Sequence, residues 1–256
     1  MPLPVDFSTL FLGYVALVFG GALCFLLFGG WRQLLTWLQP TALPATLSFG
    51  PWPMIAAAAV IGLTAWIAPA LAPGAGLAVG MLLISYSGSR PAEFWGLRGR
   101  NLGKDLRLSL ATLLTILWPV LLLLLASSSL YLALGLPLKP QPALLKFLEA
   151  RELGQLLPML ISVIVIAPIW EEVFFRGTLF PWLAGRMPVH QAQWLSALAF
   201  GAIHLHGPVL IPLASLGVFL AGIYRTSGSL IPAILVHALF NANTCALLLL
   251  GRAATE

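Results

Sequence analysis

Long apolar runs are the feature that most constrains how this chain folds. Several of them reach the roughly 20 residues that cross a bilayer as a helix. Because backbone polar groups find no water partners in lipid, such runs span it as helices. The sequence therefore predicts an all-α, polytopic membrane bundle of about eight transmembrane helices, at about 8–29, 52–71, 74–88, 107–134, 155–184, 191–206, 208–225 and 229–250. The third, sixth and seventh are short enough to be tilted or partly re-entrant.

Charge and composition exclude a soluble domain and favour one membrane orientation. Only 8% of the 256 residues are charged, against roughly a quarter in soluble domains. The net charge of +5 is interpreted as a topology signal and not as nucleic-acid binding, because basic residues favour the cytoplasmic side. With the N-terminus outside, the cytoplasmic loops carry Arg32, Arg90, Arg98, Arg100, Lys104, Arg107, Arg186 and Arg225, and the outer side Lys139, Lys146, Arg151 and Arg252.

Two segments of the N-terminal half have a predicted role. The first apolar run is not expected to be a cleaved signal peptide, because residues 1–9 contain Asp6 and no Lys or Arg. It should remain as a membrane helix. The basic stretch near 89–107 is either a solvated loop that sets the topology or a partly apolar element lying on the inner leaflet.

Adjacent glutamates interrupt the fifth apolar run. A carboxylate at membrane depth costs several kcal/mol, so a chain keeps one there when it is paired or used. Glu172 and Arg176 are four residues apart and share a helix face, so they can form an ion pair. Glu171 is rotated by about 100° from Glu172 and has no partner in the sequence, which leaves it free for chemistry. The alternative is an ion cluster that only locks helices together.

Polar residues on two later runs lie at a matching depth. His204 follows Phe200 by one turn, and His237 and Asn241 share one face of the last run. Counted from the turns near 185 and 228, Glu171 and His204 lie roughly 20 Å deep, and His237 and Asn241 roughly 14 to 20 Å deep. The sequence therefore predicts that three helices present these side chains in one layer of the membrane.

This order and spacing resemble a known family. Glu171-Glu172-Val-Phe-Phe-Arg176, Phe200-Gly-Ala-Ile-His204 and His237-Ala-Leu-Phe-Asn241 look like the EExxxR, FxxxH and HxxxN motifs of the CPBP (Abi-type) family, the CAAX prenyl proteases and bacteriocin-processing proteins. The resemblance covers about 155–245. It implies an intramembrane endopeptidase with a catalytic helical core in 151–256, preceded in 1–150 by further transmembrane helices, all in one membrane unit.

The resemblance also implies the residues' roles. Glu171 would be the catalytic glutamate, Glu172 and Arg176 the structural ion pair, and His204 would join Glu171 in handling water. His237 and Asn241 would complete the site, in a cavity open to the cytoplasm. The implied partners are the lipid bilayer and a membrane-associated protein or peptide substrate, prenylated or unprenylated, and no nucleic acid.

Two mechanisms remain open on the residues. In the favoured one no cofactor is needed, because a glutamate activates water and His237 and Asn241 supply oxyanion donors. In the other, Glu171, His204 and His237 bind zinc as a His₂Glu set. The chain has no His-Glu-x-x-His helix, which is the more familiar arrangement of such ligands.

Two other classes of function fit part of the pattern. Buried Glu, His and Arg side chains also form the proton relays of proton-coupled transporters, but the sequence shows no inverted repeat. A non-catalytic membrane partner, such as an immunity protein, would not require every motif residue to be intact.

Overall fold

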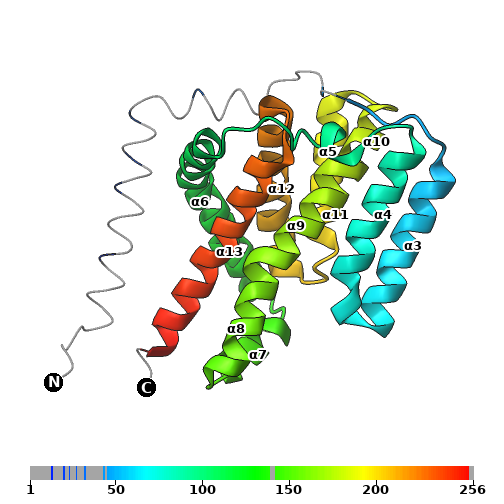
Figure 1. The fold of residues 1–256 in the computed structure, drawn as a ribbon. Coiled ribbons are helices and arrows are strands. Elements are labelled where there is room, and N and C mark those ends of the chain that lie inside the picture. The colour runs from blue at the N-terminus through cyan, green and yellow to red at the C-terminus, as the bar shows by residue number, and fades with distance from the viewer. Residues whose placement is uncertain are drawn as a thin grey trace.

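The computed structural model describes residues 45–138 and 142–253, with a few isolated positions before residue 45. Every regular element in these ranges is helical (Figure 1), which confirms the all-α prediction. The predicted span at 8–29 lies outside the described residues, apart from isolated positions. The elements are α3 (Pro51–Ile67), η2 (Pro69–Leu71), α4 (Ala72–Tyr86), α5 (Pro91–Phe94), α6 (Leu102–Ala133), α7 (Pro142–Glu149), α8 (Leu153–Ile161), η3 (Ser162–Ile166), α9 (Ala167–Phe174), η4 (Phe175–Leu179), α10 (Phe180–Ala184), α11 (Val189–Ala202), α12 (Gly207–Ser227) and α13 (Leu230–Ala253).

Five helical runs in the described ranges are long and apolar enough to cross a membrane. They are Pro69–Tyr86, Leu102–Ala133, Leu153–Ala184, Gly207–Ser227 and Leu230–Leu250. The run Leu153–Ala184, called the long helix below, comprises α8 to α10 and includes two π-helical turns, η3 and η4. All seven predicted spans after the first are helical, but the count of about eight crossings is not confirmed.

Two of the predicted spans are shorter than a full crossing. α3 has 17 residues. α11 has 14 residues and is therefore about 21 Å long, less than the roughly 30 Å of a hydrocarbon core. It ends at Ala202, and the chain reverses through residues 203–206 into α12. His204 therefore lies in the turn between α11 and α12, which can be followed in Figure 1.

Local signals explain where the helices begin and end. The Asn101 side chain accepts from the backbone N–H of Lys104 at 3.0 Å and so caps the start of α6. Gly228, at φ 66°, adopts the left-handed conformation that ends α12 and lets α13 begin two residues later. This turn is short, so α13 runs back from the end of α12.

Small residues bring α4 and α9 together. Gly76 and Gly80 are both buried and are spaced four apart on α4. A Cβ added to Gly76 would lie 2.7 Å from the Trp170 ring, and one on Gly80 would lie 2.8 Å from Val173 Cγ1. Close approach at small residues is the usual way for membrane helices to pack, since burial against other helices gains little over burial in lipid. This contact fixes α4 beside the segment that carries Glu171.

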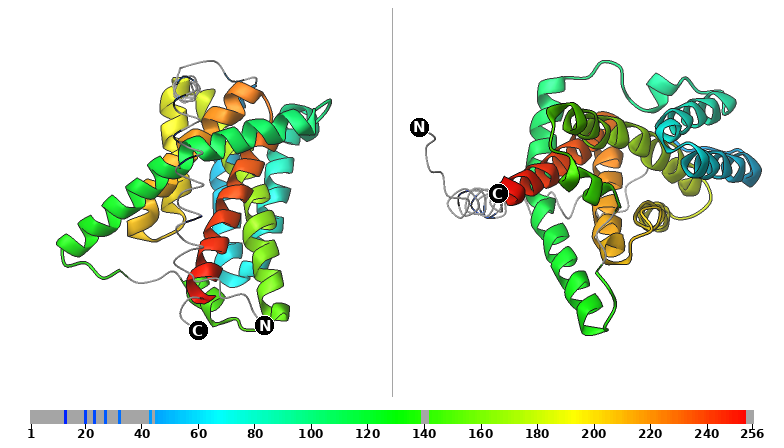
Figure 2. Two further views of the ribbon diagram at one scale, coloured as in Figure 1. Left: turned by 90° about the vertical axis from the view of Figure 1, so that its left-hand side faces the viewer. Right: turned by 90° about the horizontal axis from the view of Figure 1, so that it is seen from below.

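Packing is tight at one end of the molecule and loose at the other. Phe175, Phe180 and Tyr224 are buried near the turns at 185–188 and 228–229, whereas Leu132 and Leu153 at the opposite end are exposed. Figures 1 and 2 show α6, α8 and α13 diverging toward that opposite end. The boundary between the two regions falls within α9, where the paired glutamates are.

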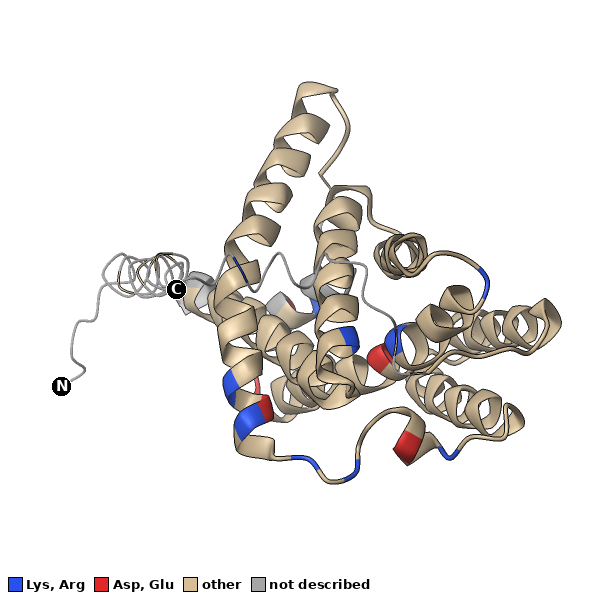
Figure 3. Cartoon of the chain, turned by 90° about the horizontal axis from the view of Figure 1, so that it is seen from above, with Lys and Arg blue, Asp and Glu red and all other residues tan. Residues whose placement is uncertain are grey.

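The basic stretch near 89–107 is part of the tightly packed end. Arg90 and Arg98 are largely exposed, as a solvated loop requires, and Figure 3 looks onto this end of the molecule with Lys and Arg in blue. Trp95, however, is only 4% exposed, and Arg100 forms an ion pair with the buried Asp105. Neither a solvated loop nor an element resting on the leaflet describes this segment fully, because its centre is inserted among the helices.

Candidate active site

Both glutamates are buried, and they have different partners. Glu172 and Arg176 have no exposed surface, and Arg176 Nη1 donates to Glu172 Oε1 at 2.8 Å. The four-residue spacing therefore brings this pair together as the helix geometry predicts. Glu171 is 8% exposed and points to another side of α9.

His237 contacts both glutamates. Its Nδ1 lies 2.9 Å from Glu172 Oε1, and its Nε2 lies 3.7 Å from Glu171 Oε2. Because an ionised carboxylate only accepts, His237 donates its Nδ1–H to Glu172, and this bond turns Nε2 toward Glu171. Sequence reasoning assigned Glu172 to Arg176 alone. Glu172 also orients His237, which is 65 positions away in the sequence. Helical spacing gives no signal for a contact over that separation.

Phe200 packs among the charged and imidazole groups. Its ring meets the His204 ring edge-on at 5.2 Å between centroids and the His237 ring at 5.5 Å. The Arg176 guanidinium carbon lies 4.4 Å from the Phe200 ring centroid, within the range of a cation–π contact. The aromatic residue of the FxxxH pattern thus separates the two histidines and covers the arginine.

His204 is half-buried at the turn after α11. Its Nδ1 lies 2.9 Å from the backbone oxygen of Phe200, one turn earlier. A carbonyl oxygen only accepts, so Nδ1 carries the hydrogen and Nε2 is left for another contact. The structure thereby brings His204 to the same aromatic ring as His237.

Asn241 is joined to the long helix. Its Nδ2 donates to the backbone oxygen of Val163 at 2.9 Å. Val163 belongs to η3, one of the two π-helical turns that flank α9. This bond uses one of the two amide hydrogens of Asn241 and ties α13 to the segment that precedes Glu171. The spacing from His237 predicts a shared face, but not this partner.

The two π-helical turns are features that the sequence analysis missed. π-turns often occur at functional sites, because the wider turn releases backbone groups from the regular helical ladder. η3 precedes α9 and accepts from Asn241, while η4 follows α9 and carries Arg176. The Gly177 oxygen in η4 accepts from the indole N–H of Trp95 at 3.0 Å. Hydrophobic periodicity carries no signal for a π-turn.

The proposed zinc ligands do not form a ready metal site. Across residues 45–138 and 142–253, no group of three or more His, Cys, Asp or Glu side chains is arranged to hold a metal ion. His204 and His237 each use Nδ1 in a hydrogen bond, which leaves Nε2 as the nitrogen that a metal would contact, and Glu171 lies against His237. A His₂Glu set would require these side chains to move.

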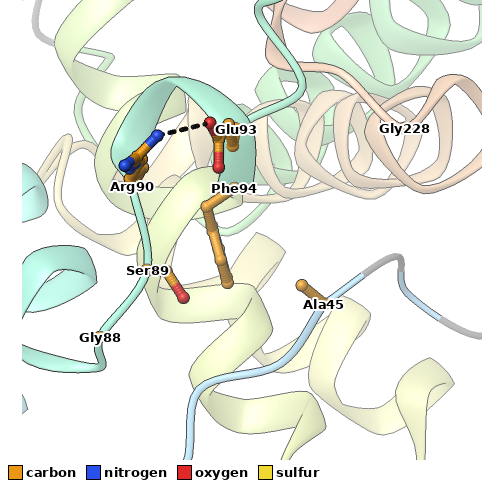
Figure 4. A pocket seen from close by; sticks show the side chains of 7 residues that line it. All are labelled: Ala45, Gly88, Ser89, Arg90, Glu93, Phe94 and Gly228. Atoms are coloured by element: carbon orange, nitrogen blue, oxygen red, sulfur yellow. Dashed lines mark ion pairs between the residues drawn. The ribbon is translucent and has the colours of Figure 1, made fainter.

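A surface pocket of about 420 Å³ lies elsewhere, at the basic end. Figure 4 shows Arg90 paired with Glu93 beside it, with Ser89 and Phe94 on its wall. The Arg90 Nη1 to Glu93 Oε1 distance is 3.5 Å. Gly228 also lines it, at the turn before α13. None of the motif residues is among the residues lining this pocket, so it is separate from the candidate site.

Comparison with known families decides the class of the C-terminal half. Residues 153–243 match the family described as type II CAAX prenyl endopeptidase Rce1-like. This segment is an Rce1-like domain. The match agrees with the resemblance drawn from the motifs, and it spans Glu171, Glu172, Arg176, His204, His237 and Asn241. No curated protein and no solved structure shows significant similarity to the chain.

The Rce1-like domain fits the architecture around it. The family match and the five helical runs that are long enough to cross a membrane together support an integral membrane protease of the CAAX type. The domain begins in the long helix and ends in α13, and these two helices contact each other through the glutamates and His237. α6 and α4, which precede it in the sequence, pack on α12 and α9.

Proposed function

We propose that this protein is an intramembrane endopeptidase in which Glu171 activates a water molecule. The observation that carries the proposal is the difference between two adjacent carboxylates. Glu172 Oε1 is engaged by Arg176 and His237 at hydrogen-bond distance, whereas Glu171 Oε2 lies 3.7 Å from His237 Nε2. A polar separation longer than about 3.5 Å is one that a bridging water can span. The family match supports peptide hydrolysis as the reaction.

The chemistry follows from the orientation of these groups. Glu171 takes a proton from water, and the oxygen attacks the carbonyl carbon of the scissile peptide bond. When the C–N bond breaks, Glu171 returns that proton to the leaving amine. Glu172 holds His237 with Nε2 toward Glu171, and His204 Nε2 is free to contact the same water. The second amide hydrogen of Asn241 and a protonated imidazole are suitable oxyanion donors.

We propose membrane-anchored peptides as the substrate class. Glu171 lies 13 residues from Ala184, so it is roughly 20 Å along the helix from the tightly packed end. Approach from that end passes the buried Phe174, Phe175 and Phe180, while residues 153–166 on the other side are mostly exposed. A substrate held in the bilayer reaches this depth by lateral movement. Prenylated peptides, named in the family description, are the first candidates to test.

The test of this function compares two conservative variants. Purified protein in lipid nanodiscs is given a farnesylated peptide and its unprenylated counterpart, and cleavage is followed by mass spectrometry. Glu171→Gln should remain folded and lose at least about 100-fold in kcat, the usual contribution of a general base. Glu93→Gln, on the exposed basic stretch, should leave kcat unchanged. Full cleavage by Glu171→Gln would exclude Glu171 as the base.

Metal removal separates the glutamate mechanism from the zinc alternative. We propose that no zinc is needed, so a strong chelator should leave cleavage largely intact, and elemental analysis should find far less than one zinc per chain. A zinc enzyme would lose activity with its metal and recover on adding it back. One zinc per active chain, missing from His204→Ala and His237→Ala, would make these residues ligands and overturn the proposal.

A further inference from the structure

The π-helical turn η4 presents a backbone oxygen to a residue from the other half of the chain. Trp95 is 4% exposed, and its indole N–H donates to the Gly177 oxygen at 3.0 Å. Gly177 directly follows Arg176, and a Cβ there would lie 2.7 Å from Trp95 Nε1. A glycine at this position therefore lets the indole approach the backbone. The bond joins residues 82 positions apart.

The backbone of Trp95 also holds the start of α13. Its carbonyl oxygen accepts from the N–H of Leu230 at 3.0 Å. This N–H is in the first turn of α13, where backbone donors have no partner within the helix. Leu230 also lies close to Gly177, since a Cβ on that glycine would be 2.9 Å from Leu230 Cδ1. One residue thus contacts both the long helix and α13.

Neighbouring contacts fix the position of Trp95. Gly96, at φ 61°, lies so close to Gly228 that a Cβ would be only 1.9 Å from the Gly228 oxygen. Arg100, which pairs with Asp105, donates to the Ser227 oxygen at 3.2 Å. The segment around Trp95 is therefore attached to the α12–α13 turn at several points, while the indole N–H bonds the long helix.

We propose that Trp95 is a positioning residue, which sets the relative register of the long helix and α13 and so the separation of Glu171 from His237. Glu172 lies five residues before Gly177, and His237 lies seven after Leu230, so each is only about 8 to 11 Å along its helix from the Trp95 contact. A helix shift at the contact is transmitted to the 2.9 Å bond between His237 and Glu172. This inference rests on the proposed function, and it assigns a role to a residue outside the Rce1-like domain.

The test uses Trp95→Phe, which keeps an aromatic ring and the backbone carbonyl but removes the indole N–H. The matched control is Trp66→Phe on α3, where the side chain is 87% exposed. Loss of one positioning hydrogen bond should lower kcat by about tenfold while KM changes less than about twofold. The control should change neither value.

A second measurement does not depend on activity. Spin labels are attached at Ile161→Cys and Ala246→Cys, both exposed, in protein with Cys24 and Cys245 replaced by Ala. Trp95→Phe should shift or broaden the distance distribution between the long helix and α13, and Trp66→Phe should not. If the parent protein cleaves no peptide, the proposed function fails, and the distances still test the register.

Other outcomes would overturn the inference. An unchanged distance distribution in Trp95→Phe would do so whatever the activity, because the register would not depend on the indole. A lower melting temperature with unchanged kcat per folded molecule would assign Trp95 to stability alone.

Discussion

At the scale of single residues, Arg176 carries a fully buried charge in the candidate site. Its guanidinium bonds Glu172 through Nη1 and lies over the Phe200 ring. A Cβ on Gly217 would lie 3.0 Å from Arg176 Nη2, so α12 leaves just enough room for the side chain. Within the described part of the chain, Nε and Nη2 of Arg176 have no hydrogen-bond partner. The arginine is therefore held by one carboxylate and by aromatic packing.

Arg176→Ala should destabilise the protein by about 3–5 kcal/mol, because it leaves Glu172 buried without its cation. Thermal unfolding in detergent, followed by circular dichroism, measures this change as a lower melting temperature. Arg98→Ala is the control: its side chain is 67% exposed and pairs with Glu93, so the loss should be under about 1 kcal/mol. Equal melting temperatures for Arg176→Ala and the parent protein would refute a structural role for the pair.

At the scale of helices, the contact between α4 and α9 links the N-terminal half of the chain to the paired glutamates. Gly80 lies against Val173, the residue after Glu172, and Gly76 lies against Trp170, the residue before Glu171. The position of α9 in the bundle thus depends on the absence of side chains on one face of α4. The Rce1-like domain is not packed on its own, since α4 and α6 lie outside it.

Gly80→Leu should separate α4 from α9 and lower stability by about 1–3 kcal/mol, the usual effect of overpacking. Cleavage should fall as well, because α9 carries Glu171. The control is Gly62→Leu on α3, where an added Cβ would meet no atom within 4 Å. Melting temperature and kcat are measured for both variants. A Gly80→Leu protein as stable and active as Gly62→Leu would contradict this packing role.

At the scale of the whole molecule, two ends differ in charge and packing. The exposed Arg90 and Arg98 belong to the tightly packed end. Leu205, 92% exposed in the α11–α12 turn, is at the far end of α12, about 30 Å along that helix from Ser227. The positive-inside tendency predicts that the basic end faces the cytoplasm. The resemblance predicts that the site opens to the cytoplasm, yet the loosely packed side of Glu171 faces away from the basic end. A cytoplasmic basic end and a site that opens to the cytoplasm are therefore compatible only if substrates enter past the basic end.

Thiol labelling in intact cells tests the orientation. Arg90→Cys and Leu205→Cys are made in protein lacking Cys24 and Cys245, and treated with a membrane-impermeant maleimide before and after lysis. We expect Arg90→Cys to react only after lysis, as a cytoplasmic residue would. Leu205→Cys, at the opposite end of the molecule, should be shielded from maleimide on the cytoplasmic side. Reaction of Arg90→Cys in intact cells would indicate the opposite orientation. The loosely packed side of Glu171 would then face the cytoplasm.

The sequence by itself determined the membrane class, the helical fold and the residues of the candidate site. Apolar length predicts helices because lipid cannot bond to the backbone, and a four-residue spacing predicts the Glu172–Arg176 contact because helix geometry is local. The family resemblance agreed with the match to residues 153–243. The catalytic roles, the absence of zinc and the direction of opening stay predictions.

Only the tertiary structure decided how the helices meet. It joined His237 to Glu172, Asn241 to Val163, and Trp95 to Gly177 and Leu230. It also ended α11 at Ala202, so that this predicted span is too short to cross a bilayer. These contacts depend on the register and close packing of segments distant in sequence. Periodicity along one helix specifies which face is polar, but not which atom of another helix it will meet.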